Sequence, residues 1–199
     1  MSFDIQTNKT EIEDVRQSQT VIKSQTDDKI TELENQLIKL EIHARKRNLL
    51  FYGVQVDQSL EKEDTEAVIR TLLHKSVKLD QTIVESMSFI NVHRLGQPKS
   101  RLSVTTGPPS SPPPPAIIVV FMHQSDWDLV LYSAKNLQGT RITIGTDLPV
   151  KLKKKRDLLA SEAYKIRKEK HMKTRIRVVD ADVILEASVD RRVWNVIKM

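Results

Sequence analysis

Residues 48–54 read Asn48-Leu49-Leu50-Phe51-Tyr52-Gly53-Val54, and this stretch determines how the rest of the chain divides. Its apolar run, rich in aliphatic and aromatic side chains and closed by a glycine, predicts a buried β-strand. The basic residues Arg45-Lys46-Arg47 precede it, and residues 1–44 before them contain no glycine or proline. We therefore expect a long helix before the strand and an α+β domain after it.

Residues 1–44 carry an apolar pattern typical of a coiled coil. Seam residues recur at steps of three and four, with one additional step of four near Thr26, and polar Gln19 and Thr26 lie within the seam. A stripe this narrow suits a coiled coil better than a core-facing helix, so we expect copies of the helix to associate. A long helix folded onto the rest of the chain is the alternative. The expected oligomerisation residues are Ile12, Val15, Ile22, Ile30, Leu33, Leu37, Leu40 and Ala44.

The pattern after the first strand predicts the order strand, helix, strand, strand, helix, strand. The further elements are a helix over Glu61–Ser76, strands over Phe89–Arg94 and Ala116–Phe121, a helix over Ser125–Asn136 and a strand over Arg141–Ile144. This order is that of the split βαβ, ferredoxin-like arrangement, with both helices on one face of a four-stranded sheet. RNA-recognition-motif (RRM) domains share it, although the fold also serves unrelated functions. We assign the RRM-like domain to residues 45–145.

A Pro-rich segment, Gly107–Pro115 (GPPSSPPPP), interrupts this domain. It can form neither a helix nor a central strand. We expect residues 97–115 to be a disordered loop between the second and third strands. The alternative is a linker between two domains, which would leave one βαβ half on each side of it.

Residues 146–199 predict a smaller α+β unit. Asp147 supplies an acidic cap, and Pro149 lies near the first turn of a helix that reaches Lys170. The elements expected after it are strands at Thr174–Val179 and Val183–Leu185, joined by the turn Asp180-Ala181-Asp182, and a short helix at Ser188–Ile197.

The net charge of +6 is unevenly distributed along the chain. Residues 1–44 hold 5 basic and 9 acidic side chains, residues 45–150 hold 12 and 10, and residues 151–199 hold 15 and 7. From Lys151 to Arg177, twelve bases face only three acids, whereas a solvated helix face normally mixes both signs. This excess indicates a polyanionic partner. The expected nucleic-acid-binding residues are Arg45, Arg47, Arg94, Lys99, Arg101, Lys135, Lys153, Lys154, Lys155, Arg156, Arg175 and Arg177.

The few aromatic residues do not predict base-specific recognition. Phe51 and Tyr52 are adjacent on the first strand and must point to opposite faces, so one of them could stack on a base, with core packing as the alternative. The third strand, Ala116–Phe121 (AIIVVF), lacks the basic and aromatic RNP1 pattern. Binding dominated by the sugar–phosphate backbone is therefore expected.

The sequence contains no pattern that indicates catalysis. A Gly-rich phosphate loop, a G-x-S-x-G elbow and an H-E-x-x-H pair are all missing, and the chain has no cysteine. The five histidines (His43, His74, His93, His123 and His171) have no metal-ligand spacing. We expect a non-enzymatic protein without metal or cofactor. With no secretory pattern and no run of about 18 apolar residues, a protein of the reducing cytosol or nucleus is expected.

Several of these segments together resemble a known family. They are Arg45–Val54 (RKRNLLFYGV), Phe89–Gly96 (FINVHRLG), Ala116–Phe121 (AIIVVF) and Leu137–Pro149 (LQGTRITIGTDLP), followed by the basic Lys153–Arg156. In this order and spacing they resemble the first-open-reading-frame RNA-binding protein of LINE-type retrotransposons, a family also called transposase type 22, although no transposase activity is implied. The likeness covers roughly residues 45–185.

The resemblance implies a parallel coiled-coil homotrimer, a non-standard RRM domain and a small C-terminal domain. In this family the last two domains clamp single-stranded RNA, and also DNA, coat the element's transcript in ribonucleoprotein particles of the cytoplasm and nucleus, and act as a nucleic-acid chaperone. The element's reverse transcriptase is an implied partner. The residues that match the family's basic positions are Arg94, Lys135, Lys155, Arg156 and Arg175.

Two departures from the family pattern are expected to weaken RNA binding. The loop before the third strand offers only Lys99 and Arg101 before neutral Pro/Ser sequence, and the final hairpin has Asp180-Ala181-Asp182 where the family carries a lysine. A coiled-coil scaffold whose globular end binds protein, with the Pro-rich segment as a polyproline ligand, is the alternative function. A host protein domesticated from such an element is a further one.

Overall fold

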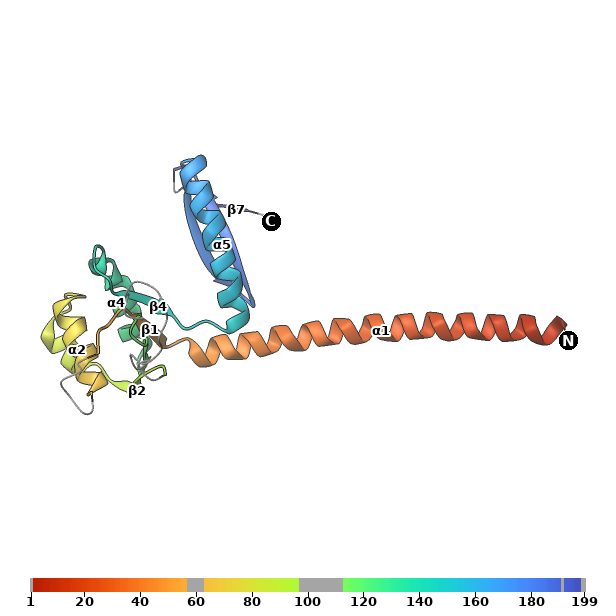
Figure 1. The fold of residues 1–199 in the computed structure, drawn as a ribbon, viewed down its shortest axis with the longest axis horizontal. Coiled ribbons are helices and arrows are strands. Elements are labelled where there is room, and N and C mark those ends of the chain that lie inside the picture. Colours follow the sequence, from red (N-terminus) through yellow and green to blue (C-terminus); the bar gives the residue numbers. More distant parts are fainter. Residues whose placement is uncertain (1, 57–62, 97–112, 191, 198–199) are drawn as a thin grey trace, which may run out of the picture. The chain divides into compact units, whose positions relative to one another are not determined.

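The computed structural model of this protein describes residues 2–56, 63–96, 113–190 and 192–197. The chain is an α+β protein with a long N-terminal helix and two antiparallel sheets (Figure 1). It divides into two compact units. One is Ala44–Leu148, and the other comprises Met1–His43 together with Pro149–Met199.

The N-terminal stretch is a single helix, α1 (Ser2–Arg45), which confirms the helix expected over residues 1–44. Its 44 residues span about 65 Å at 1.5 Å per residue. The side chain of Ile12 lies outside the described residues, and Ala44 is exposed. Among the larger seam residues, exposure runs from 49% at Ile30 to 68% at Leu40. The stripe is therefore left open to solvent in a single chain.

The Ala44–Leu148 unit is built on a four-stranded sheet of order β2-β3-β1-β4, in which all neighbouring strands are antiparallel. Its elements are β1 (Asn48–Tyr52), α2 (Thr65–Lys75), α3 (Gln81–Ser86), β2 (Phe89–Arg94), β3 (Ile117–Phe121), α4 (Gln124–Ser133), the 3-10 helix η1 (Ala134–Leu137) and β4 (Thr143–Thr146).

The core of this unit lies between one face of the sheet and the helices. Alternating residues of β1 and β3 project into it, because successive strand residues point to opposite faces. The buried side chains that meet there are Leu49 and Phe51 of β1, Ile117, Val119 and Phe121 of β3, Ile69, Leu72 and Leu73 of α2, and Val130 of α4. Phe89 packs edge-to-face on Phe121, with ring centroids 5.3 Å apart.

The predicted elements of this unit are present, with corrected boundaries. β2 has the predicted bounds, whereas α2 begins at Thr65 because the Asp64 carboxylate caps it by accepting the Ala67 N–H. The predicted second helix is divided into α4 and η1, and the last strand begins at Thr143, not Arg141. The short helix α3 was missed. Most of the Pro-rich segment lies outside the described residues.

Gly53, directly after β1, is required by its backbone conformation and by its surroundings. Its φ is +78°, and a Cβ added there would lie 2.2 Å from the Arg141 carbonyl oxygen. We expect Gly53→Ala to lower the free energy of unfolding by about 2–5 kcal/mol, since it adds left-handed backbone strain to a backbone clash. Urea unfolding followed by circular dichroism measures this loss. Gly139→Ala is the control, because Gly139 has a similar φ of +85° but open space around its Cβ position.

The C-terminal part consists of α5 (Val150–Glu169) and a three-stranded antiparallel sheet of order β5-β6-β7. The strands are β5 (Lys173–Val179), β6 (Asp182–Ser188) and β7 (Asn195–Val196). α5 packs on one face of this sheet. The buried residues are Leu152, Leu159 and Ala163 of the helix and Val183, Leu185 and Ala187 of β6.

Two predictions for the C-terminal part were wrong. Asp147 does not cap α5, whose N-cap residue is Pro149; instead the Asp147 carboxylate accepts hydrogen bonds from Arg45 and Asn48. The helix predicted at Ser188–Ile197 is absent from the part of this segment that the structure describes. There the chain forms β7, which pairs with β6, and the Ile197 N–H donates to the Leu185 carbonyl.

Candidate nucleic-acid interface

Helix α5 carries the densest concentration of positive charge in the described chain. Eight basic and three acidic side chains lie within its 20 residues. The apolar stripe of Leu152, Leu159 and Ala163 faces the sheet, so the lysines between these positions are directed toward solvent. A regular helix thereby arranges the cations along an exposed surface about 30 Å long.

The cations of α5 differ in how they are engaged. Arg156 is paired with Asp157 at 3.1 Å, and Lys165 with Glu162 at 2.7 Å, which raises the pKa of Lys165 through that hydrogen bond. Within the described residues, no carboxylate is paired with Lys153, Lys154 or Lys168 of α5 or with Lys170, the residue that caps its C-terminal end, and all four lysines are exposed. These four lysines, which we call the open lysines, can bind an anion without first breaking an ion pair.

Lys155 is held by the hairpin. Its Nζ lies 2.5 Å from the Asp182 carboxylate, and this hydrogen bond lowers the pKa of Asp182 below its ordinary value. Because the folded-state pKa is depressed, the stability that the pair contributes is present above the unfolded-state pKa and is lost as pH falls through the folded-state pKa. Because Lys155 is already paired with Asp182, an anion must compete with this carboxylate of the turn in order to bind the lysine.

We expect Asp182→Asn to raise affinity for single-stranded RNA about threefold to tenfold, because it frees Lys155 and removes a negative charge. The slope of log affinity against log salt should steepen by about 0.7, the value for one additional phosphate contact. Asp180→Asn removes the same charge from the same turn, but no ion pair of Asp180 is present among the described residues. Fluorescence anisotropy of both variants over a salt series measures the difference. Equal effects would mean that only net charge matters.

The structure divides the predicted C-terminal cluster into two surfaces. Arg175 and Arg177 lie opposite Glu186 and Ile184 in the β5–β6 pairing, whereas α5 contacts the face formed by Val183, Leu185 and Ala187. The two arginines therefore project from the face of the sheet that α5 does not cover. Sequence reasoning grouped them with the α5 lysines because strand alternation was not applied to β5.

In the described part of the Ala44–Leu148 unit, the side chains predicted to bind nucleic acid already contact other groups of the protein. Arg45 pairs with Asp147 at 3.3 Å, and Arg47 donates to the Met122 carbonyl at 2.5 Å. The ammonium of Lys135 lies 3.9 Å from the ring centroid of Tyr132, and its hydrogen bond lowers the pKa of that phenol. Lys99 and Arg101 lie outside the described residues.

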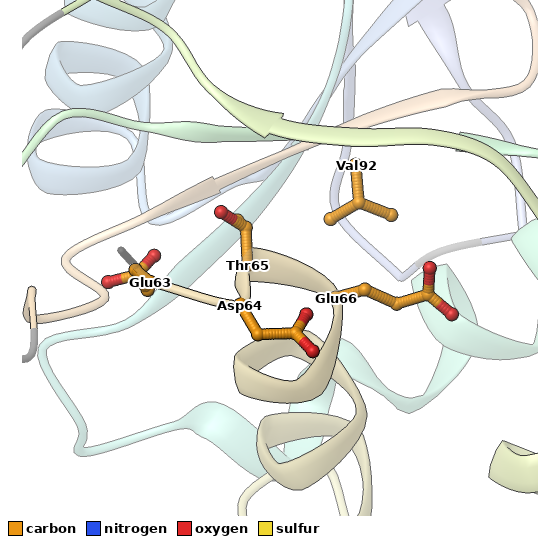
Figure 2. Close-up of a pocket in the computed structure, with 5 residues that line it drawn as sticks. All are labelled: Glu63, Asp64, Thr65, Glu66 and Val92. Carbon is orange, nitrogen blue, oxygen red and sulfur yellow. The ribbon is translucent and has the colours of Figure 1, made fainter. Parts of the chain in front are cut away.

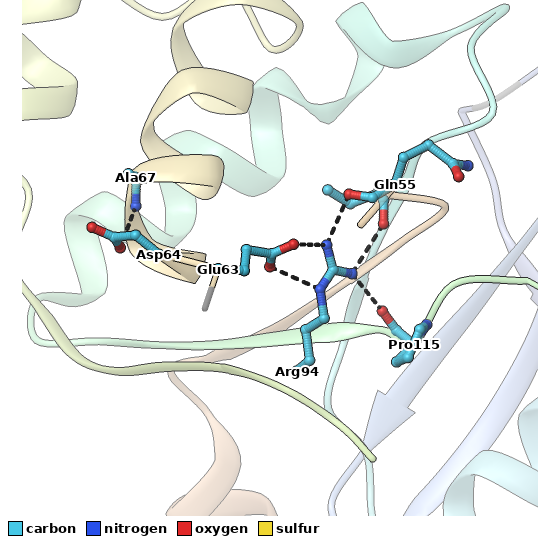
Figure 3. A network of polar contacts seen from close by, with 7 residues as sticks. Gln55, Glu63, Asp64, Ala67, Arg94 and Pro115 are labelled. Atoms are coloured by element: carbon cyan, nitrogen blue, oxygen red, sulfur yellow. Dashed lines mark hydrogen bonds and ion pairs between the residues drawn. The ribbon is translucent and has the colours of Figure 1, made fainter. Parts of the chain in front are cut away.

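Arg94 was predicted to bind nucleic acid, but its guanidinium is fully used inside the protein. It makes two hydrogen bonds to the Glu63 carboxylate, at 2.8 and 3.0 Å. The other donors bond to the carbonyls of Val54, Gln55 and Pro115, at 2.9–3.0 Å (Figure 3). An arginine has five N–H donors, and five bonds are present here. In this geometry Arg94 has no donor left for a phosphate.

An open pocket of about 550 Å³ lies at the start of α2, lined by Glu63, Asp64, Thr65, Glu66 and Val92 (Figure 2). Its three carboxylates are all engaged, since Glu63 binds Arg94, Asp64 caps α2 and Glu66 binds Arg70 at 2.7 Å. The acidic lining does not suit a phosphate. In these contacts the three carboxylates stabilise the fold.

No protein-family model matches the chain, and a search of curated proteins found no match to its sequence. In the part of the chain that the structure describes, no group of three or more His, Asp or Glu side chains could hold a metal ion, and no helix is long and apolar enough to cross a membrane.

The sheet of the Ala44–Leu148 unit has a second face, and it is almost without charge. Phe51 is fully buried in the core, and Tyr52 projects to the opposite face, 36% exposed. Its neighbours on that face, by the register of the described strands, are Leu50, Ile118, Val120, Asn91 and His93. This face could accept a base on Tyr52, but among the described strand residues that form it there is no lysine or arginine to contact the phosphates.

Proposed function

We propose that the protein binds single-stranded RNA with little sequence preference, mainly through the open lysines of α5. The observation that carries this proposal is a helix with eight bases and three acids on which exposed lysines lack carboxylate partners within the described residues. Phosphates supply the matching charge, and displaced counterions supply much of the binding free energy. Base contacts are secondary because the sheet of the other unit carries one exposed tyrosine and no basic RNP1 pattern.

The finer fold assignment is part of the proposal. We infer that the Ala44–Leu148 unit is an RRM-like, ferredoxin-like domain, supported by its strand order β2-β3-β1-β4, its antiparallel pairing and its core-covering helices. This order agrees with the resemblance to the RNA-binding protein of LINE-type retrotransposons. Membership would make the bound strand the element's own transcript, coated in a ribonucleoprotein particle, and would add chaperone activity.

Self-association through α1 is the second part of the proposal. The exposed seam residues, from Val15 to Leu40, match a coiled coil of identical chains, and a trimer follows from the family resemblance. Several basic modules on one stalk would bind one strand with greater avidity than a single module. Sedimentation of the full chain at several concentrations should give a mass close to three times 22.8 kDa.

The decisive test is the salt dependence of binding to unstructured RNAs of different sequence. Four open lysines predict a slope of log affinity against log salt of about −3 for each bound chain, with similar values for all sequences. Flat binding between low and moderate salt would contradict the proposal. Strong preference for one sequence would instead indicate base readout. Retention of a protein partner without any RNA binding at low salt would favour the scaffold alternative.

A further inference from the structure

The face of the C-terminal sheet that α5 leaves uncovered carries a second group of cations. Lys173, Arg175 and Arg177 alternate along β5 and lie opposite Ser188, Glu186 and Ile184 of β6. Alternate strand residues are about 6.8 Å apart, which is comparable to the separation of successive phosphates in an extended single strand. Edge strand β5 thus presents a row of three positive charges.

Trp194 lies in the same group. The guanidinium carbon of Arg175 is 4.1 Å from the centroid of the Trp194 ring, which is stacking distance. The residue was missed in the sequence because a helix was predicted there, whereas the short strand β7 pairs beside β6 and brings the indole against Arg175. The half-buried indole is part of a mixed cationic and aromatic surface.

The buried carboxylate of Glu186 contacts both Arg175 and Arg177 and orients their side chains on this surface. Its side chain is only 9% exposed, while those of Arg175 and Arg177 are 41% and 54% exposed. Its carboxylate accepts from Arg175 Nε at 2.5 Å and lies 3.7 Å from Arg177 Nη1. One carboxylate thereby fixes the plane of the Arg175 guanidinium, and the group still keeps an excess of positive charge.

We propose that this face is a second contact site for single-stranded nucleic acid. A base stacks on the Arg175–Trp194 pair, and the adjoining phosphates bind Lys173 and Arg177. Nucleobases stack readily on indole rings and on guanidinium planes, and such contacts tolerate any sequence. The site rests on the proposed function and deepens it, because it supplies the base contact that α5 lacks. An acidic protein surface would match the charge but would leave the Arg175–Trp194 stack unused.

The test compares two ligands of equal length and charge, an oligoadenylate and its abasic counterpart. In the full chain, Trp194→Leu should weaken binding to the oligoadenylate about tenfold and change binding to the abasic strand less than twofold. Trp194→Phe keeps an aromatic ring and should retain most of the affinity. Lys153→Gln combined with Lys154→Gln is the matched control, expected to weaken both ligands alike.

A second measurement does not depend on replacing Trp194. In a Trp127→Phe chain, Trp194 is the remaining tryptophan, and its fluorescence should be quenched by the oligoadenylate but not by the abasic strand. Unchanged affinity of Trp194→Leu, or equal loss for both ligands, would overturn the stacking site while the proposed function stands. Failure of the unmodified chain to bind either ligand at low salt would overturn the proposed function itself. Polyglutamate binding that depends on Trp194 would replace the site with an acidic protein partner.

Discussion

Replacing Arg94 with alanine is expected to lower the free energy of unfolding of the Ala44–Leu148 unit by about 3–5 kcal/mol, because it leaves the Glu63 carboxylate without its cation. Both side chains of this pair are 10% exposed, so water cannot fully compensate. The substitution also removes the donor that holds the carbonyls of Val54, Gln55 and Pro115 together. Chemical denaturation with circular dichroism measures the loss.

A matched control exists in the same unit. Arg141 is exposed, and its side chain has no ion pair among the described residues, so Arg141→Ala should change stability by less than about 0.5 kcal/mol. The comparison also tests the original prediction for Arg94 as an RNA contact. If Arg94→Ala weakened RNA binding at unchanged stability, the internal role assigned to this arginine would be wrong.

The largest effect on binding is expected from the triple substitution Lys153→Gln, Lys154→Gln and Lys168→Gln. If each lost phosphate contact is worth about 1 kcal/mol, affinity for single-stranded RNA should fall about 100-fold. The salt slope should become shallower by about 2, since each single-strand contact contributes about 0.7. Glutamine keeps helix propensity, so the melting temperature should be nearly unchanged.

The control for this variant removes the same charge from elsewhere. Lys23, Lys29 and Lys39 are exposed on α1, and their replacement by glutamine leaves the same net charge as the α5 variant. We expect that control to retain most of the affinity and the salt slope. Equal losses in the two variants would show that binding follows overall charge and has no site on α5.

Much of the architecture could be predicted because apolar periodicity is a local signal. The stripe of α1, the strand Phe89–Arg94 and the hairpin after α5 are each visible in a short window of sequence. Helix α3 was missed because six residues are too few to show a helical period, and it depends on the Asp80 cap, which accepts the Thr82 N–H. β7 was missed because two residues acquire strand geometry only by pairing with β6.

The candidate site was less predictable, since it depends on contacts between distant residues. A count of charges cannot show that a carboxylate and three backbone carbonyls converge on Arg94, or that Asp182 holds Lys155. Nor could it reveal that Trp194 lies against Arg175. The alternation of side chains along a strand is visible in the sequence, and it would have placed Arg175 and Arg177 together on one face of the hairpin.

The bonds around Arg94 have a consequence for how this protein can be changed. Its link to the Pro115 carbonyl, and the 2.7 Å bond from the Leu95 N–H to the Ala116 carbonyl, fasten together the two ends of the segment between β2 and β3. With its ends fixed, doubling the length of such a segment costs only about 0.6 kcal/mol of closure entropy. We therefore expect the sheet to tolerate a change in the length of the chain that joins these two fixed ends, such as the insertion of an epitope tag.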